Sequence, residues 1–133
     1  MSATTDLIDM SQLAEIMMLD DEGSNEFTVM MMTDGFKQIE DAVPQLYECA
    51  DTMDYVKYFE LSHYLKGPVS YLGLKAVAAM FEQMSECTRH SKEKTAEELP
   101  NKDELRAMID QLVNVRDITK QYLIENMNFT QLK

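Results

Sequence analysis

The chain is poor in the residues that interrupt helices or cross-link small folds. Its 133 residues include four glycines, three prolines and two cysteines. Because glycine and proline are scarce and apolar residues recur at spacings of three and four, the sequence predicts an all-α protein. Cys49 and Cys87 lie far apart on separate predicted helices. They offer poor material for a disulfide framework or a thiolate metal site, so a reducing, intracellular setting is expected.

Long apolar runs and basic residues are also scarce. No run approaches the ~18 apolar residues that a membrane span needs, and the N-terminus, with Asp6 and Asp9, lacks the basic region of a signal peptide. Twelve basic and 24 acidic residues give a net charge of −12 and a pI near 4.4. Such a surface would repel nucleic acid and anionic membranes, so neither is expected as a partner. Residues 1–133 are expected to form a single domain.

Apolar periodicity and capping signals predict five helices. Pro44 is expected to bend the second helix without ending it, whereas Gly67 and Pro68 are expected to kink or stop the third. Asn101, with Glu104 three residues later, resembles a capping box at the start of the last helix. The predicted ranges are 10–19, 25–50, 51–67, 70–89 and from 101 onward, with a charged linker over 90–100.

Four long amphipathic helices joined by short connections bury their apolar stripes most economically as an antiparallel four-helix bundle. The additional short N-terminal helix is expected to lie across one end of that bundle. The twelve methionines are expected mostly to fill gaps in the core. Any that escape the core would form an adaptable docking surface.

The third predicted helix carries a histidine among neighbours suited to holding a phosphoryl group. Tyr58 and Ser62 belong to a stripe that faces the core, and His63 points away from it, so its ring is expected to meet solvent. A neutral imidazole can attack an acyl phosphate without a separate activating base. Lys66 would supply positive charge beside it, and Gly67 would leave space for a partner's backbone. An inert surface histidine fits the spacing alone equally well.

These residues resemble the core motif of the histidine-containing phosphotransfer (HPt) domain. Nearly the whole chain is similar to the free-standing intermediates of fungal phosphorelays. The family's H-x-x-K-G motif stands here as His63-Tyr64-Leu65-Lys66-Gly67, and Leu72-Gly73-Leu74 matches the small-residue turn before the family's next helix. Near the N-terminus, Glu15-Ile16-Met17, Leu19-Asp20-Asp21 and Phe27 are similar to features of the fungal proteins.

The resemblance implies that His63 is the phosphoacceptor, Lys66 a charge neutraliser and Gly67 the spacer beside the imidazole. The chain would shuttle phosphoryl groups between receiver-domain aspartates of a hybrid sensor histidine kinase and of response regulators in a two-component phosphorelay. No cofactor or metal is expected on the chain, and magnesium is expected only on the receiver. A monomer is expected, in the cytoplasm and with the nucleus as a second compartment. The residues implied to dock the receiver are Ile16, Leu19, Asp20, Phe27, Met31 and Tyr64.

The chain departs from the family directly after the glycine. Pro68 and Val69 stand where the family usually has two small, often hydroxylated residues. A serine there could orient the second ring nitrogen of His63, as outer hydrogen-bond partners do for other functional histidines, and proline cannot. Ser70 and Ser85 are the candidates to replace it.

Two other functions fit parts of the sequence. A helical adaptor that binds receiver domains without phosphotransfer would tolerate Pro68. A di-metal carboxylate bundle is suggested by the Glu-x-x-His unit of Glu60 and His63, but such sites need a second unit and two further glutamates. The other histidine, His90, has its glutamate four residues earlier, at Glu86. The glycines stand singly, which excludes a glycine-rich nucleotide loop, so autophosphorylation from ATP is not expected.

Overall fold

The computed structural model describes residues 7–132, and its regular structure is helical throughout that range. No strand occurs within it. The predicted all-α fold class is therefore confirmed. The elements are α2 (Met10–Met17), α3 (Glu26–Thr52), α4 (Tyr55–Tyr71), α5 (Lys75–Thr88) and α6 (Lys102–Met127), with short 3-10 turns η1 (Ser91–Glu93) and η2 (Thr130–Leu132).

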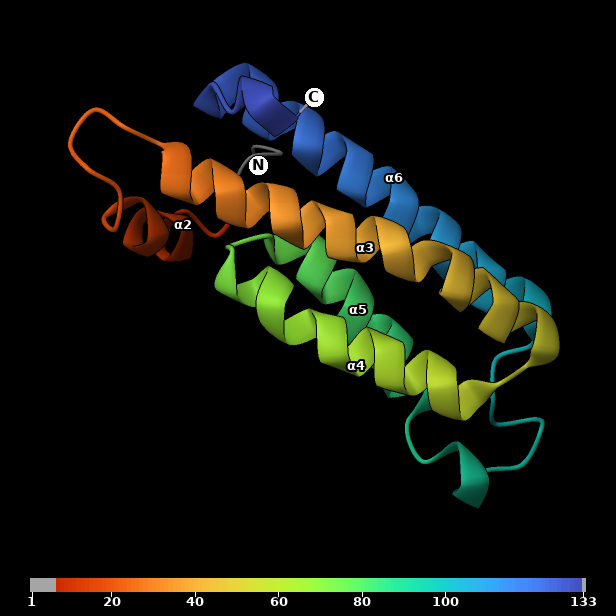
Figure 1. Cartoon of the computed structure of the whole chain (residues 1–133). Coiled ribbons are helices and arrows are strands. Elements are labelled where there is room, and N and C mark those ends of the chain that lie inside the picture. Colours follow the sequence, from red (N-terminus) through yellow and green to blue (C-terminus); the bar gives the residue numbers. More distant parts are fainter. Residues whose placement is uncertain (1–6, 133) are drawn as a thin grey trace.

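The four long helices form an antiparallel bundle. α4 packs on α3 and on α5, and α6 closes the ring by contacting both α3 and α5. Figure 1 shows α2 lying across the end of the bundle at which α3 begins. The predicted four-helix bundle with a short N-terminal helix at one end is confirmed.

The break between α4 and α5 falls later than the sequence predicted. α4 continues through Pro68 and ends at Tyr71, so the predicted start of the next helix at residue 70 is wrong. A proline removes one hydrogen-bond donor, a loss that this well-packed helix absorbs, and α3 likewise continues through Pro44. Gly73 ends the helical path because it adopts φ +79°, a left-handed conformation that glycine reaches without steric cost.

The turn at Gly73 is also where α2 is attached to the bundle. The Asp9 amide donates to the Gly73 carbonyl at 2.8 Å, and the Gln12 side-chain amide donates to the Tyr71 carbonyl at 2.9 Å. A Cβ at residue 73 would lie 2.9 Å from the Asp9 carbonyl oxygen, so this close approach requires glycine. These contacts fix α2 beside the C-terminal end of α4.

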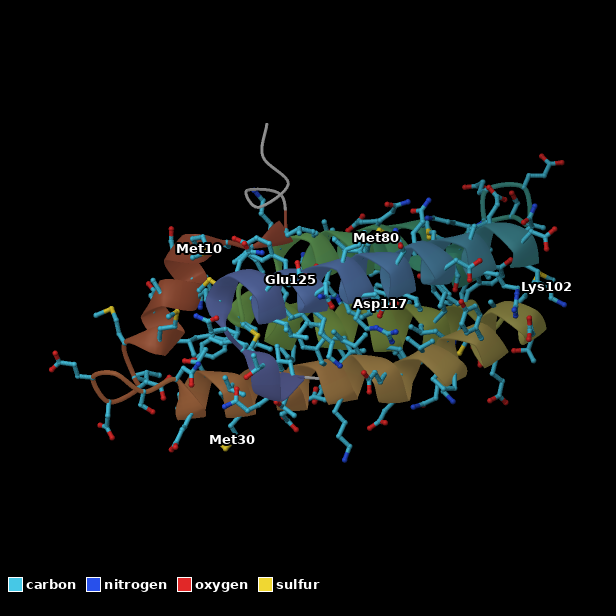
Figure 2. All side chains as sticks on the ribbon, turned by 90° about the horizontal axis from the view of Figure 1, so that it is seen from above. Met10, Met30, Met80, Lys102, Asp117 and Glu125 are labelled. Carbon is cyan, nitrogen blue, oxygen red and sulfur yellow. The ribbon has the colours of Figure 1, made fainter. Side chains whose placement is uncertain are left out.

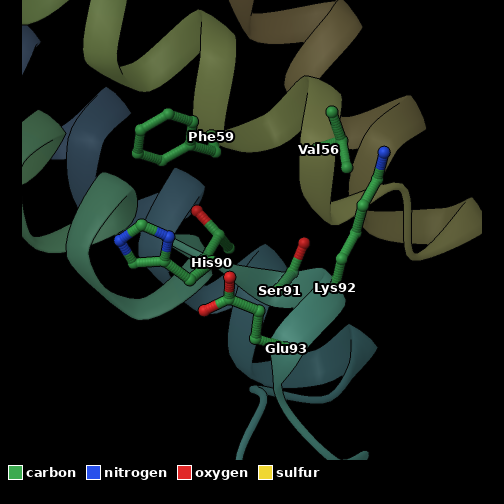
Figure 3. Close-up of a pocket in the computed structure, with 7 residues that line it drawn as sticks. Val56, Phe59, His90, Ser91, Lys92 and Glu93 are labelled. Carbon is green, nitrogen blue, oxygen red and sulfur yellow. The ribbon is translucent and has the colours of Figure 1, made fainter.

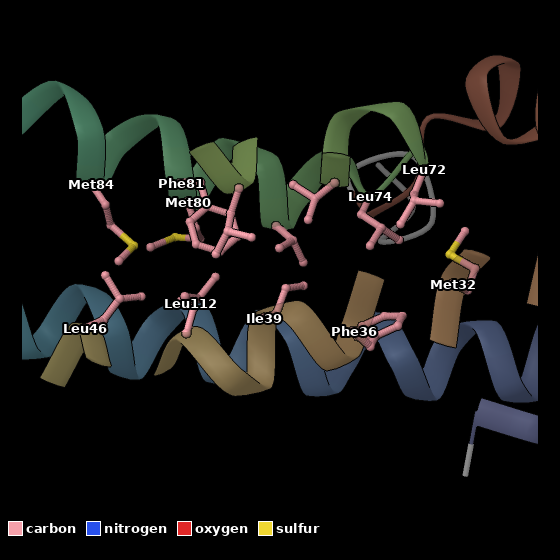
Figure 4. Close-up of a cluster of buried hydrophobic side chains, with 14 of the residues drawn as sticks. Met32, Phe36, Ile39, Leu46, Leu72, Leu74, Met80, Phe81, Met84 and Leu112 are labelled. Atoms are coloured by element: carbon pink, nitrogen blue, oxygen red, sulfur yellow. The ribbon is translucent and has the colours of Figure 1, made fainter. Parts of the chain in front are cut away.

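Aliphatic and aromatic side chains from all four long helices fill the bundle. Figure 4 shows Phe81 of α5 opposite Ile39 of α3 and Leu112 of α6. Tyr58 of α4 is fully buried, and its hydroxyl donates to the Leu105 carbonyl at 3.0 Å. Each large apolar side chain buried in this way contributes about 1.5–3 kcal/mol to stability.

The methionines are distributed differently from the prediction. Within residues 7–132 only Met32, Met80 and Met84 are buried, whereas Met18 and Met30 are 81% and 58% exposed. Figure 2 shows Met30 projecting from the outer side of α3. Met31, Met108 and Met127 are partly buried and pack against the core. The described methionines thus divide almost evenly between core and surface, and several exposed ones lie where a partner protein could make contact.

Neither cysteine is cross-linked. Cys49 is buried and Cys87 partly buried, and both are free. Burial raises the pKa of the Cys87 thiol to about 11, so little thiolate forms at neutral pH.

Among residues 7–132, no helix combines the length and the apolar character that crossing a bilayer requires.

Candidate functional site

His63 stands on the outer face of α4, as the apolar spacing predicts. The helix begins at Tyr55, where the carboxylate of the N-cap residue Asp54 accepts the Lys57 amide at 3.1 Å. The helical period leaves His63 exposed to solvent. On the opposite, core-facing side, the buried residues of α4 are Tyr58, Ser62, Leu65 and Val69.

The His63 ring rests on Phe59, one turn earlier in the helix. The two ring centroids are 5.2 Å apart, and the ring planes are 13° from parallel. The Arg89 guanidinium carbon lies over the same phenyl ring, 5.3 Å from its centroid. Within residues 7–132 the His63 ring has no hydrogen-bond partner, so the stacking is the one aromatic or polar contact of this side chain. Neither Phe59 nor Arg89 was predicted, although the four-residue spacing of Phe59 from His63 was a usable signal.

Lys66 connects α4 to α5. Its ammonium forms an ion pair with the Glu82 carboxylate, and the two side chains are 41% and 39% exposed. A hydrogen bond from Lys66 is the main cause that holds the pKa of Glu82 below its ordinary value. Because Lys66 follows His63 by three residues, the predicted charge lies on the same side of the helix, but a carboxylate engages it. Glu82 was not predicted from the sequence.

Gly67 is exposed, and a Cβ at this position would meet no atom within 4 Å. Gly35 of α3 is the opposite case, because an added Cβ would overlap Leu72 Cδ1. A glycine within a helix is destabilising by roughly 0.5–1 kcal/mol relative to alanine. Packing within the chain does not require a glycine at position 67. This favours the interpretation that a binding partner requires it.

No serine replaces the hydrogen bond that Pro68 cannot make. Ser85 is buried, and its hydroxyl donates to the Glu82 carbonyl of its own helix at 2.9 Å. Ser70 is exposed. In the described part of the chain neither hydroxyl bonds to His63, so neither of the two candidates fills this role.

The residues implied to dock a receiver domain occupy different environments. Leu19 and Tyr64 are 62% and 70% exposed, and Phe27 and Met31 are half-buried. Ile16 is only 1% exposed. A partner cannot reach a side chain that is sealed in the core, so the docking role of Ile16 is corrected to one of anchoring α2.

Asp20 serves the start of α3. Its carboxylate accepts the Phe27 amide at 2.7 Å, the Thr28 amide at 3.0 Å and the Thr28 hydroxyl at 2.5 Å. These bonds, the Thr28 hydroxyl above all, lower the pKa of Asp20. The N-cap residue Asn25 makes no side-chain capping bond, so Asp20 supplies that function from the α2–α3 connection. Asp20 therefore has a structural role within the chain, and because it is partly exposed its docking role stays a prediction.

A small groove of about 80 Å³ separates α3 from the end of α4, and its lining includes Met31, Pro68 and Tyr71. Tyr71 is 49% exposed, and Met18 in the α2–α3 connection is even more so. Neither was predicted as a docking residue. Both side chains add to the exposed apolar surface of the chain. We call the set Met18, Leu19, Phe27, Met31, Tyr64 and Tyr71 the candidate docking face.

The di-metal alternative lacks the required geometry. Glu60 and His63 are both exposed, whereas metal sites in helical bundles are built from inward-facing side chains. In the part of the chain from residue 7 to residue 132, no group of three or more His, Cys, Asp or Glu side chains could hold a metal ion.

Comparison with known proteins gives three consistent findings. The Hpt domain family matches residues 26–115. Multistep phosphorelay regulator 1 of Schizosaccharomyces pombe is 30% identical over 78 residues, which are 59% of this chain and 26% of that protein. The chain thus spans about a quarter of the length of this curated relative.

Solved structures of the yeast phosphorelay protein YPD1 share the fold. One matches with a TM-score of 0.76 at 17% sequence identity and covers 92% of this chain and 95% of its own. A triclinic crystal form matches with a TM-score of 0.77 at 18% identity, covering 96% and 98% of the two chains.

Proposed function

Because this chain belongs to the Hpt domain family, whose members pass phosphoryl groups through a histidine in phosphorelays, we propose that His63 is its phosphoacceptor. The observation that carries the proposal is the outward-facing, unbonded imidazole at the head of the His63–Gly67 motif. A buried ring could not be reached by the aspartyl phosphate of a visiting receiver domain.

Transfer to His63 requires little beyond position and charge. A ring nitrogen attacks the phosphorus of an aspartyl phosphate on a receiver domain. An N–P bond forms, the acyl P–O bond breaks, and the aspartate leaves as a carboxylate. The proton on the other ring nitrogen stays on the ring or passes to water. Transfer to a second receiver reverses these steps, so one exposed histidine serves both directions.

Lys66 and Arg89 bring positive charge to the neighbourhood of His63, in a chain whose net charge is −12. A phosphoryl group adds close to two negative charges. Lys66 shifts from Glu82 toward that group, and the shift costs little because an exposed ion pair contributes little to stability. The same cations favour the approach of the carboxylates with which a receiver holds magnesium.

The candidate docking face supplies the contact that orients the receiver. Tyr64 adjoins His63 in sequence, and Met18, Leu19 and Tyr71 add further exposed apolar surface. Methionine adapts its shape to different surfaces, which suits a carrier that binds a donor and then an acceptor. Its proposed partners are the receiver domains of a hybrid sensor histidine kinase and of response regulators.

We also propose that the chain works as a monomer without a bound cofactor. The magnesium used in transfer belongs to the receiver domain. The chain acts in the cytoplasm, with the nucleus as a second compartment. It does not phosphorylate itself, so ATP alone leaves it unlabelled.

Labelling tests the proposal. The chain, mixed with a receiver phosphorylated on its aspartate, should acquire an acid-labile, base-stable label. His63→Gln should acquire none while its circular dichroism spectrum stays that of the wild type. His90→Gln is the matched control, because it removes the only other histidine of the sequence, and it should be labelled normally. Label that persists in His63→Gln contradicts the proposal.

The same mixture distinguishes the adaptor alternative, which Pro68 keeps open. A carrier loses phosphate to a second, unphosphorylated receiver, whereas an adaptor binds a receiver and exchanges nothing. Stable binding without any transfer would favour the adaptor.

A further inference from the structure

The orientation of the His63 ring needs a cause that hydrogen bonding does not provide. Within residues 7–132 the ring has no hydrogen-bond partner, and Pro68 carries neither an N–H nor a hydroxyl group. An imidazole that rotates freely presents its nitrogens in many directions, whereas in-line transfer to phosphorus uses one. Some other contact must therefore hold the ring.

Phe59 makes that contact. Its ring is nearly parallel to the imidazole, at 13°, with the centroids 5.2 Å apart. The lone pair of an imidazole nitrogen lies in the plane of the ring. An aromatic neighbour stacked on one face restrains rotation of the imidazole and leaves the in-plane direction of attack open.

Phe59 is itself held by charge rather than by crowding. The Arg89 guanidinium lies 5.3 Å from the centre of its ring, a cation–π arrangement, and Arg89 also bonds to the Glu86 carboxylate at 3.0 Å. On another side Phe59 borders a cavity of about 270 Å³, which Val56 and residues 90–93 also line (Figure 3). The phenyl ring has room to turn away, so its place against His63 reflects a favourable contact.

We propose that Phe59 is a positioning residue for phosphoryl transfer, which holds the His63 imidazole in the plane from which it attacks the receiver's aspartyl phosphate. The inference rests on the proposed role of His63 as phosphoacceptor. It explains how the chain functions with Pro68: an aromatic contact from the turn before the histidine replaces a hydrogen bond from the turn after it.

Three substitutions separate positioning from packing. Phe59→Leu keeps an apolar side chain without the flat ring, Phe59→Tyr keeps the ring, and Val56→Ala alters the same cavity away from the stacked pair. For each variant we would measure the urea midpoint, the maximal rate of transfer from a phosphorylated receiver and the receiver concentration that gives half that rate. Phosphoramidate, a small donor that approaches without docking, provides the reference reaction.

Phe59→Leu should lower the maximal transfer rate about tenfold or more. The half-saturating receiver concentration and the rate with phosphoramidate should change little. Phe59→Tyr and Val56→Ala should transfer at close to the wild-type rate. An unchanged maximal rate in Phe59→Leu overturns the proposal, as does an equal loss in Phe59→Tyr or a loss confined to half-saturation. A wild-type chain that takes no label on His63 contradicts the proposed function instead.

A spectroscopic readout is independent of activity and of the stability of any variant. The sequence has two histidines, so the ring C–H signals form two sets, which His90→Gln assigns. Stacking on Phe59 should move the His63 ring protons upfield. The shift should survive Phe59→Tyr and disappear in Phe59→Leu. Ring protons of wild-type His63 at their random-coil positions would overturn the proposal, whether or not the residue is phosphorylated.

Discussion

The inner and outer faces of α4 differ in how their side chains are bonded and packed. On the inner face, the Tyr58 hydroxyl donates to the Leu105 carbonyl at 3.0 Å, and the Ser62 hydroxyl donates to the Tyr58 carbonyl at 2.8 Å. On the outer face, the His63 side chain makes no hydrogen bond within the described residues, and a Cβ on Gly67 would meet no atom within 4 Å. The inner face completes its hydrogen bonds within the chain, and the outer face leaves His63 and Gly67 accessible.

This difference teaches that stability and transfer are separable on a single helix. Ser62 is fully buried and its neighbour His63 is exposed, because adjacent residues of a helix point about 100° apart. Inner-face substitutions should therefore change the free energy of unfolding, and outer-face substitutions should change the rate of phosphoryl transfer. Four measurements test whether that division holds.

The largest effect is expected from the inner face. Tyr58→Ala should lower the free energy of unfolding by about 3–5 kcal/mol, because it leaves a cavity in the core. Urea denaturation measures this change. Tyr64→Ala is the control on the outer face and should stay within about 0.5 kcal/mol of the wild type. Equal destabilisation by the two substitutions would refute the division.

Gly67→Ala, on the outer face, should slow phosphoryl transfer without destabilising the fold. Transfer from a phosphorylated receiver should slow by about 10–100-fold, since a small displacement of the partner misaligns the reacting atoms. The free energy of unfolding should stay constant or rise by up to about 1 kcal/mol, because alanine favours helix.

Gly35→Ala is the matched control for Gly67→Ala. Its Cβ would overlap Leu72 Cδ1, so it should destabilise the fold by roughly 1–3 kcal/mol while the folded fraction transfers normally. If Gly67→Ala instead destabilises the fold and transfers at the wild-type rate, Gly67 is a structural residue.

Lys66→Ala should produce a smaller change, restricted to chemistry. Loss of the ammonium should slow transfer or shorten the lifetime of the phosphohistidine about tenfold, equivalent to about 1.4 kcal/mol. The urea midpoint should scarcely change, since exposed ion pairs contribute little. Kinetics with labelled receiver measure both quantities, and a wild-type rate together with a wild-type lifetime would remove the role assigned to Lys66.

The smallest effect is a pH-dependent difference at Glu82. The pKa of Glu82 is lowered in the folded chain, chiefly by the hydrogen bond from Lys66. The ion pair therefore stabilises the fold fully above the unfolded pKa of about 4.5. This stabilisation is lost as the pH falls through the lowered pKa of the folded chain. The urea midpoints of Glu82→Gln and wild type should therefore differ slightly at neutral pH and converge in strong acid. A difference that persists in strong acid would mean that the carboxylate is not its source.

Periodicity predicted the architecture because the amphipathic pattern records which side of each helix is buried. The outward orientation of His63 and the capping box of Asn101 and Glu104 were both predicted, and both are confirmed. Each depends on residues within one turn of each other in the sequence. Local spacing is enough to fix such features.

Contacts between helices were beyond the reach of the sequence. The Lys66–Glu82 pair and the Arg89–Phe59 contact join α4 to α5, and their partners are chosen by packing. The end of α4 was misplaced for a related reason, since the buried Val69 and Leu72 hold the helix together beyond Pro68. Ile16 was misassigned because apolar residues on a short helix look alike until their neighbours are known.

The attachment of α2 to Gly73 has a consequence for how the surface of the chain can evolve. Main-chain atoms of Asp9 and Gly73 make part of the attachment, and a main-chain bond tolerates changes of side chain elsewhere on the surface. Substitutions at Met18 and Leu19 could retune which partners a lineage accepts without loosening the helix that presents them. The surface around Met18 and Leu19 can thus change while α4, which carries His63, stays the same.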